Sequence, residues 1–152
     1  NHPTVREEVE QAVTALMAHY TPRKKVLFLC RRNACRSPMA GAWAQRLAGD
    51  RLDVATGGSE PAERSDPDMA KVMAEQGVDM AFRTPRGIDA ALANGAPDAI
   101  ITLGGAPCPV VPGVLRQDWD VPDPAGQPIE VMRQVRDEIE ARVKQLITAL
   151  VP

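Results

Sequence analysis

The chain has 152 residues, which suits one domain with a substantial core. A formal net charge of −2 gives no reason to expect nucleic acid or an anionic membrane surface as partner, and no apolar run approaches the length of a membrane span. Three cysteines, an odd and small number, indicate a reducing cytoplasm rather than a disulfide framework. The chain has only two histidines, His2 and His19, and both are far in sequence from any cysteine, so a zinc site is not expected and no metal site is predicted.

The hydrophobic pattern predicts alternating helices and strands. Apolar residues recur at helical spacing from Thr4, which is placed to cap a helix, to about Tyr20, where Thr21-Pro22 should end it. This helix forms a predicted N-terminal extension, residues 1–22, to a main domain, residues 23–152. The predicted strands are Val26–Leu29, Leu52–Thr56, Ala99–Leu103 and Val114–Gln117, and the predicted helices are Ser37–Leu47, Asp66–Gln76, Pro85–Ala93 and Ile129–Leu150.

Such alternation is typical of an α/β fold with a parallel, doubly wound sheet flanked by helices. Within it, Gly57-Gly58 should stop the second strand, and Gly77 should cap the helix that begins at Asp66. Ligands of these sheets bind at the carboxyl ends of strands, near the point where the strand order switches. The residues that follow the first strand are therefore candidates for a site.

The loop after the first predicted strand carries the strongest chemical signal in the chain. It reads Cys30-Arg31-Arg32-Asn33-Ala34-Cys35-Arg36, and Ser37-Pro38 after it is typical of a helix start, with Ser37 as N-cap. Free backbone N–H groups above the positive end of a helix can hold a tetrahedral oxyanion. Cys30 would point into this cradle from one end, and the Arg36 fork would close the other. We expect Cys30 to be largely thiolate at neutral pH, and therefore a nucleophile aimed at a bound oxyanion.

The remaining residues of this loop, with Ala34 among them, would complete the oxyanion cradle, and several admit two interpretations. Asn33 should hold the shape of the loop, because asparagine tolerates positive φ. Ser37 could donate a hydrogen bond to the Cys30 sulfur as well as cap the helix. Cys35 could be a reversible disulfide partner of Cys30 or a small side chain packed under the loop. Arg31 and Arg32 could add positive potential at the entrance or be simple solvated charges.

Two later segments should lie on the same rim, because each follows a predicted strand. The first holds Cys108 in a loop rich in glycine and proline, where it could attack an adduct on Cys30 or be a packed side chain in a rigid turn. The second holds Asp123-Pro124. A carboxyl group fixed there could donate a proton to a leaving oxygen, or the segment could be a solvated acidic turn.

The run Val-Leu-Phe-Leu-Cys-x-x-Asn-x-Cys-Arg-Ser-x-Met-Ala around Cys30 resembles the phosphate loop of the low-molecular-weight tyrosine phosphatase superfamily, particularly its arsenate reductase branch. The similarity extends from about Lys25 to the C-terminus and includes Cys108–Gly113 and Asp123–Gln127. The resemblance implies a four-stranded parallel sheet flanked by helices. It also implies that Cys30 is the nucleophile, Arg36 the oxyanion clamp, Ser37 the partner of the thiolate and Asp123 the general acid.

The implied activity is the reduction of arsenate to arsenite, with phosphate and sulfate as competing oxyanions and no bound cofactor. Cys30 would attack arsenic, and a second thiol would then release arsenite. Thioredoxin-coupled relatives use two cysteines around the loop after the third strand, but Gly104 replaces the first and only Cys108 remains. The second thiol is therefore Cys108, served by thioredoxin, or a small external thiol such as mycothiol or bacillithiol with a glutaredoxin-like protein. The Gly-rich loop and the N-terminal helix favour the external thiol.

Two other functions fit parts of the pattern. A low-molecular-weight tyrosine or aryl phosphatase would use the same nucleophile, arginine and acid, and Arg36-Ser37-Pro38 fits that branch. However, Ala125-Gly126 follow the Asp-Pro pair, where such phosphatases tend to carry tyrosines that wall the substrate ring. A non-catalytic oxyanion-binding module would need no acid, so Asp123 argues against it. The sequence therefore favours a cytoplasmic arsenate reductase that works with a redox partner protein.

Overall fold

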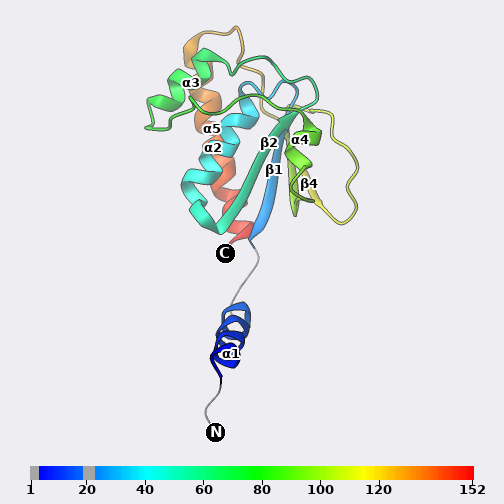
Figure 1. Cartoon of the computed structure of the whole chain (residues 1–152). Coiled ribbons are helices and arrows are strands. Elements are labelled where there is room, and N and C mark those ends of the chain that lie inside the picture. The colour runs from blue at the N-terminus through cyan, green and yellow to red at the C-terminus, as the bar shows by residue number, and fades with distance from the viewer. Residues whose placement is uncertain (1–3, 19–22) are drawn as a thin grey trace.

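The computed structural model describes residues 4–18 and 23–152. Four strands form one parallel sheet in the order β2-β1-β3-β4 (Figure 1). They are β1 (Lys24–Cys30), β2 (Leu52–Gly58), β3 (Ala99–Leu103) and β4 (Leu115–Trp119). This topology confirms the predicted parallel α/β sheet. The strand order switches between β1 and β3, because the chain first moves outward to β2 and only later returns to the other side of β1.

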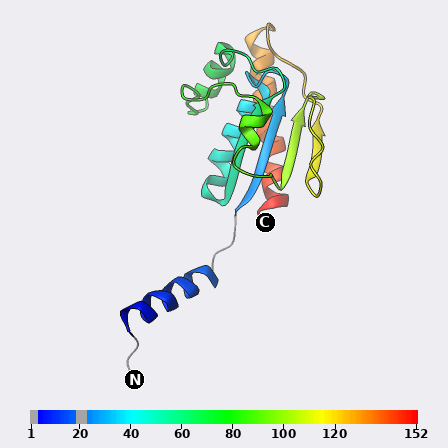
Figure 2. The same ribbon diagram turned by 45° about the vertical axis from the view of Figure 1, so that its right-hand side comes forward.

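Helices cover both faces of this sheet (Figure 2). On one face α2 (Arg36–Ala48) packs against α5 (Ile129–Leu150), and α3 (Pro67–Ala74) packs against the same α5. The short α4 (Ile88–Leu92) packs against β2 on the other face, and a 3-10 turn, Gly49–Arg51, joins α2 to β2. The predicted helices and strands are therefore all present, with ends that shift by a few residues.

Side chains of β1 alternate between two apolar cores. Val26 and Phe28 belong to the large core under α2 and α5, whereas Leu27 and Leu29 belong to the smaller core under α4. All four are fully buried, as expected for an inner strand covered on both faces. Cys30 follows Phe28 by two residues and therefore emerges on the side of α2, in the large core.

Strand β2 extends two residues beyond its predicted last residue, Thr56, and stops at the predicted glycine pair, with Gly58 as its final residue. Strand β2 runs through both glycines, and Gly58 pairs with Cys30. A Cβ atom on Gly58 would lie 2.6 Å from the carbonyl oxygen of Arg31 and 2.8 Å from the nitrogen of Asn33. The glycine is needed because the loop after β1 crosses directly over the end of β2.

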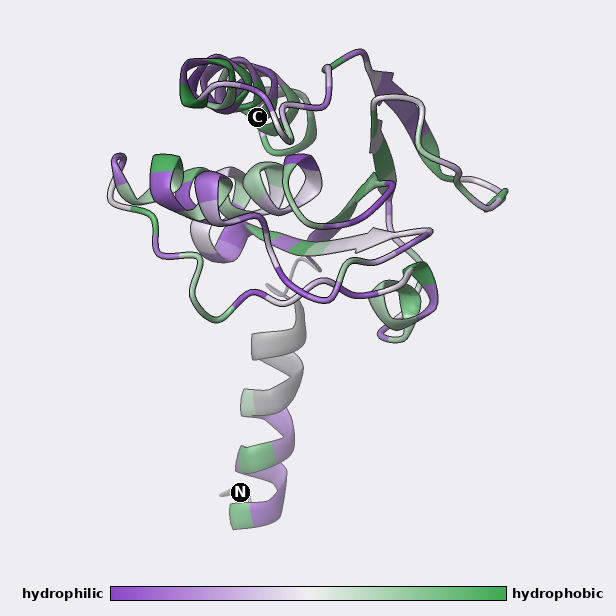
Figure 3. Ribbon diagram, turned by 90° about the horizontal axis from the view of Figure 1, so that it is seen from above, coloured by the Kyte–Doolittle hydropathy of each residue, from purple (hydrophilic) through white to green (hydrophobic). Residues whose placement is uncertain are grey.

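The N-terminal helix α1 (Val5–Ala18) begins with the predicted cap. The Thr4 hydroxyl accepts the Glu7 N–H at 3.2 Å, and the Glu7 carboxylate accepts the Thr4 N–H at 2.8 Å. The predicted end near Tyr20 and Thr21-Pro22 lies outside the described residues. Helix α1 stands apart from the sheet (Figure 1), and Figure 3 shows hydrophobic and hydrophilic residues interspersed along the coloured part of the helix, near its N-terminus. No described helix combines the length and apolar character of a membrane span.

Helix α3 ends at Ala74 with Glu75 in the C-cap position, so the predicted cap at Gly77 is wrong, although the chain turns at Gly77 two residues later. Ion pairs join this end of α3 to α5. The turn has Gly77 at φ +75°. Just before it, the Glu75 carboxylate lies 2.7 Å from Arg133 and 2.9 Å from Arg136. Arg136 is buried, and it also donates to the carbonyl oxygen of Val72 at 2.9 Å. The hydrogen bonds from Arg133, with those from Arg136, lower the pKa of Glu75 to about 2.

We expect Glu75→Gln to lower the thermal unfolding midpoint at neutral pH but not in strong acid. Folding favours the charged form of Glu75, so its contribution is present above the unfolded-state pKa of about 4.3 and declines as the pH falls toward the folded-state value of about 2. Midpoints of the wild type and the variant should therefore converge below that window. Glu63→Gln, at an exposed carboxylate outside the cluster, is the control. A difference between the two unfolding midpoints that stays constant with pH would contradict the lowered pKa of Glu75.

Candidate active site

A cleft of about 620 Å³ opens at the carboxyl ends of β1 and β3, where the strand order switches. Its floor is the loop that joins β1 to α2. Its walls are the segment before α3, the turn after β3 and the turn before α5. Cys30, Arg36 and Asp123 all line it. The structure thus brings together three of the four side chains predicted to be catalytic.

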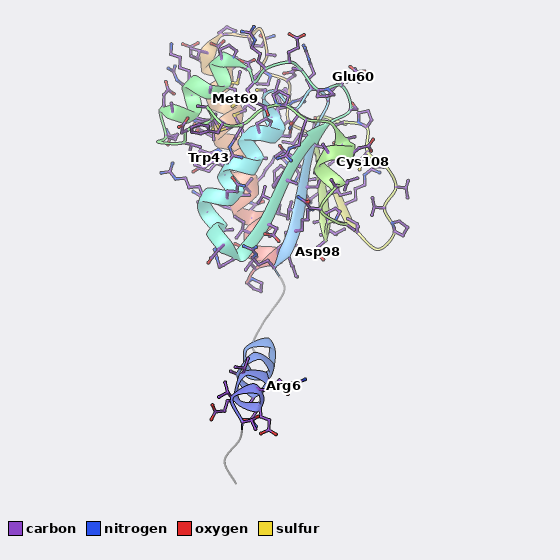
Figure 4. The ribbon with its side chains drawn as sticks, viewed as in Figure 1. Arg6, Trp43, Glu60, Met69, Asp98 and Cys108 are labelled. Atoms are coloured by element: carbon purple, nitrogen blue, oxygen red, sulfur yellow. The ribbon has the colours of Figure 1, made fainter. Side chains whose placement is uncertain are left out.

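Three backbone hydrogen bonds hold this loop from outside. The carbonyl oxygens of residues 31, 32 and 34 accept from the N–H groups of Glu60, Ala62 and Asp66, at 2.8, 2.9 and 2.9 Å. Figure 4 labels Glu60 at this end of the sheet. Because a trans peptide is planar, a carbonyl turned outward directs the N–H of the next residue inward. Within the described part of the chain, no N–H group from residue 32 to residue 36 donates to a protein acceptor, so these donors are available to a ligand.

Asn33 and Ser37 arrange the surroundings of the Cys30 sulfur. Asn33 has φ +49°, as predicted, and its Oδ1 accepts the N–H of Arg86 at 2.9 Å. Its Nδ2 donates to the Ser37 hydroxyl at 2.7 Å, which leaves the hydroxyl hydrogen available for the Cys30 Sγ at 2.9 Å. The Ser37 N–H also points at this sulfur, at 3.4 Å.

The predicted N-cap role of Ser37 is wrong, although its predicted contact with the sulfur is confirmed. Helix α2 begins one residue earlier, at Arg36, with Cys35 in the N-cap position and no side-chain cap. Ser37 is fully buried inside the first turn, where its hydroxyl is occupied by Asn33 and Cys30. The first turn therefore lacks a side-chain cap at the end that faces the cleft.

The Arg36 side chain lies across the turn after β3. Its Nη1 donates to the carbonyl oxygen of Val121 at 3.0 Å, and its Nη2 lies 4.0 Å from the carboxylate of Asp123. Gly104 makes room for it, because a Cβ atom at this position, where φ is +69°, would collide with the guanidinium group. The fork is therefore fixed by a carbonyl, a carboxylate and the absence of a side chain.

Asp118 holds the turn on which Arg36 lies. One carboxylate oxygen accepts both the Thr102 hydroxyl at 2.6 Å and the Gly105 N–H at 3.0 Å. The Gly104 N–H donates to the carbonyl oxygen of Trp119 at 2.9 Å. These bonds connect the ends of β3 and β4, so the position of Gly104 is set by the sheet itself.

Asp123 lies at the open side of the cleft. Its side chain is 56% exposed, and Oδ1 accepts the Ala125 N–H at 3.0 Å. The other oxygen faces Arg36 at 4.0 Å. A carboxyl group in this position can exchange protons with solvent and reach an oxyanion held beside Arg36.

The other two cysteines have different surroundings. Cys35 is buried with its Sγ 3.3 Å from the Met132 sulfur, and burial raises the pKa of its thiol far above the usual range. This favours the packed interpretation of Cys35. Cys108 does not line the cleft: it packs on the core under α4, and burial raises the pKa of its thiol although Arg116 opposes the shift. Figure 4 shows Cys108 beside α4, whereas Trp43 lies on the other flank. The structure does not bring Cys108 to Cys30.

Two charged side chains of the cleft, Arg64 and Asp66, were not among the residues predicted from the sequence. Asp66 caps α3, because its Oδ1 accepts the N–H groups of residues 68 and 69 at 2.8 and 3.3 Å. The pair Asp66-Pro67 carried the signal, since it has the form of an N-cap followed by proline at the first helical position. Arg64 had no such signal, because the segment before α3 has no regular structure.

Within residues 4–18 and 23–152, no group of His, Cys, Asp and Glu side chains has the arrangement of a metal site. His2 and His19 lie outside the described residues. The chemistry available in the cleft is therefore that of a thiol, a set of N–H donors, a guanidinium group and a carboxyl group.

Comparison with known proteins assigns this arrangement to a family. Residues 25–151 match the family described as low molecular weight phosphotyrosine protein phosphatase. The chain belongs to this family. Arsenate reductase 1 of Bacillus cereus (strain ATCC 10987 / NRS 248) is 40% identical over 127 residues, which are 81% of this chain and 93% of that protein.

Solved structures of this phosphatase family show the same fold. One described as an arsenate reductase in the phosphate binding state has a TM-score of 0.74 at 35% identity, over 84% of this chain and 98% of that chain. A thioredoxin-dependent arsenate reductase of Corynebacterium glutamicum has a TM-score of 0.72 at 28% identity, over 95% of this chain and 70% of that chain. These matches confirm the resemblance to the arsenate reductase branch of the family.

We expect Ser37→Ala to slow the alkylation of Cys30 by iodoacetamide about tenfold, because the hydroxyl that stabilises negative charge on the sulfur is lost. Peptide mass spectrometry separates the cysteines, and Cys108 should react at an unchanged rate as an internal control. Ser65→Ala removes another hydroxyl group of the cleft and should leave Cys30 unaffected. An unchanged rate at Cys30 in Ser37→Ala would argue against the hydrogen-bond network.

Gly104→Ala should weaken phosphate binding about tenfold, because the new methyl group displaces Arg36 from its position. Gly105→Ala is a matched control: its φ of +70° imposes the same backbone strain, but no atom lies within 4 Å of its Cβ position. Calorimetric titration with phosphate measures both. Equal losses in the two variants would show that strain, rather than the displacement of Arg36, is responsible.

Proposed function

We propose that the protein is a cytoplasmic arsenate reductase that serves arsenic resistance. The observation that carries the proposal is a single cleft in which a thiol, Cys30, is combined with free N–H donors, Arg36 and Asp123. Relatives that cover most of the chain, at 40% and 35% identity, are named arsenate reductase, which supports the same activity here.

In the first step arsenate occupies the cradle as a phosphate mimic. The N–H groups of the loop and Arg36 bind its oxygens, and the Cys30 thiolate attacks arsenic. Asp123 donates a proton to the oxygen that leaves as water. The product is a covalent adduct with a bond from Sγ to arsenic, in which arsenic is still pentavalent.

In the second step another thiolate attacks the Cys30 sulfur. A disulfide bond forms, the bond between sulfur and arsenic breaks, and its electron pair stays on arsenic, which leaves as arsenite. Two thiols are thereby oxidised to a disulfide while arsenic gains two electrons. No bound cofactor takes part in either step.

A small external thiol, such as mycothiol or bacillithiol with a glutaredoxin-like protein, is the favoured second thiol. Cys108 packs under α4, outside the cleft, and Gly104 has no space for a relay cysteine beside Arg36. The alternative is attack by Cys108 after its loop moves, followed by reduction by thioredoxin. The relative from Corynebacterium glutamicum is described as thioredoxin-dependent. Thioredoxin is therefore included among the reductants in the assay below.

A phosphatase is the second candidate, because the same cradle and nucleophile can act on a phosphoester. Within the described part of the chain, no aromatic side chain lines the cleft. Ala125 lies where a ring of the enzyme could otherwise stack on a phosphotyrosine ring. The cleft therefore suits a small oxyanion better than an aryl phosphate.

Cys30→Ser should abolish arsenate reduction with every reductant, with a loss of about a thousandfold or more, while phosphate binding stays measurable. Asp123→Asn should slow the reaction about a hundredfold, because it removes the proton donor. The assay follows arsenite release with thioredoxin and with a thiol–glutaredoxin system, beside hydrolysis of p-nitrophenyl phosphate.

Cys108→Ser serves as the discriminating variant in the same assay. Activity with a small thiol but not with thioredoxin would support the external route, and loss with both would make Cys108 the second thiol. Faster hydrolysis of the phosphate ester than reduction of arsenate by the wild type would replace the proposal with a phosphatase.

A further inference from the structure

Three exposed arginines, Arg31, Arg32 and Arg64, line one end of the cleft. Across residues 4–18 and 23–152, none of their guanidinium groups takes part in an ion pair or hydrogen bond, although ion pairs are common elsewhere on the surface. Two of the three come from the loop and the third from the segment before α3, so two separate elements direct positive charge to the same opening.

Among the described residues, neither carboxylate of the cleft forms an ion pair with these arginines. Asp66 uses Oδ1 to cap α3. Asp123 faces Arg36 rather than the entrance arginines. The entrance is therefore positively charged even though the whole chain is slightly negative, with a formal net charge of −2.

The cleft is also larger than its first substrate requires. A volume of about 620 Å³ lies within the range of pockets that hold whole organic ligands, about 300 to 1,000 Å³. Arsenate occupies only the end where Cys30, the free N–H groups and Arg36 converge. Arg31, Arg32 and Arg64 also line the cleft, which therefore has space and positive charge for a second ligand.

We infer that these three arginines bind the carboxylate groups of the small thiol that resolves the Cys30 adduct, and that they select anionic thiols, such as bacillithiol, over thiols without a carboxylate, such as mycothiol. This inference rests on the proposed function. The attacking thiolate and the arsenic adduct both carry negative charge, so they repel each other at the distance of reaction. Guanidinium groups offset this repulsion if they lie within a Debye length of the reacting sulfur atoms, which is about 8 to 10 Å at moderate salt. A carboxylate bound by a guanidinium fork also holds the thiol in the cleft above Cys30.

The thiol supplies one of the two sulfur atoms that are oxidised when arsenic gains its two electrons. The sulfur of the anionic thiol bonds to Cys30 Sγ, the electron pair of the bond to arsenic leaves with arsenite, and the thiol remains as a mixed disulfide. The entrance arginines exchange no electrons or protons. They act only by binding the thiol and by their positive charge. Their removal should therefore slow the reaction of an anionic thiol more than that of an uncharged thiol.

The test compares two thiols that differ in charge. Arsenite release by the full chain is measured at limiting concentrations of mercaptosuccinate, which carries carboxylates, and of 1-thioglycerol, which carries none. Arg31→Gln, Arg32→Gln and Arg64→Gln should each slow the reaction of mercaptosuccinate about fivefold and that of thioglycerol less than about twofold. Lys71→Gln removes an exposed positive charge of α3 outside the cleft and should leave both rates unchanged.

The outcomes separate the inference from the proposed function. Equal losses for both thiols in the arginine variants, or release of arsenite by thioredoxin but not by mercaptosuccinate, would overturn the inference and leave the reductase intact. No arsenite with any thiol or with thioredoxin would instead overturn the proposed function. Added salt should slow mercaptosuccinate much more than thioglycerol in the wild type, and an equal effect on both would also count against the inference.

Discussion

The site depends on one constraint, the outward rotation of three carbonyl groups in the loop between β1 and α2. The N–H groups of residues 60, 62 and 66 hold these carbonyls, so the N–H groups that follow them turn inward. The segment that supplies these donors is fixed at its far end by Asp66, which caps α3, and α3 is tied to α5 by the pairs of Glu75. Gly58 allows the loop to approach β2 closely enough for this arrangement. The oxyanion cradle is therefore built by elements far apart in the sequence.

A second dependence links Arg36 to the sheet. Its guanidinium group lies where a side chain of residue 104 would be, and Asp118 holds that turn through Thr102 and Gly105. Thioredoxin-coupled relatives are expected to carry a relay cysteine at the position of Gly104. In this chain the Arg36 guanidinium group occupies the space where that side chain would lie. The glycine at position 104 therefore both excludes a relay cysteine there and allows Arg36 to lie in its present position.

Sequence patterns predicted the local parts of this site and missed the nonlocal ones. The strand before Cys30, the positive φ of Asn33 and the contact of Ser37 with the sulfur follow from residue type and short spacing. The cap role of Ser37 failed, because Asn33 and Cys30 occupy its hydroxyl. The reason for a glycine at position 58 could not be predicted, because the close contact that it allows is with the loop after β1. Arg64 could not be predicted, since nothing local shows which part of an irregular segment faces a cleft.

The position of Cys108 bears on the choice between the two proposed sources of the second thiol, Cys108 itself and a small external thiol. For Cys108 to reach Cys30, its loop must leave the core under α4 and cross to the other face of the sheet. That loop begins at Gly104 and Gly105, whose bonds to Asp118 and Trp119 hold the turn beneath Arg36. Movement would therefore loosen Arg36, the proposed ligand of the arsenic oxygens, at the stage when the proposed adduct is present. The proposed external thiol would enter through the open end of the cleft and leave those bonds intact, on the side lined by Arg31, Arg32 and Arg64.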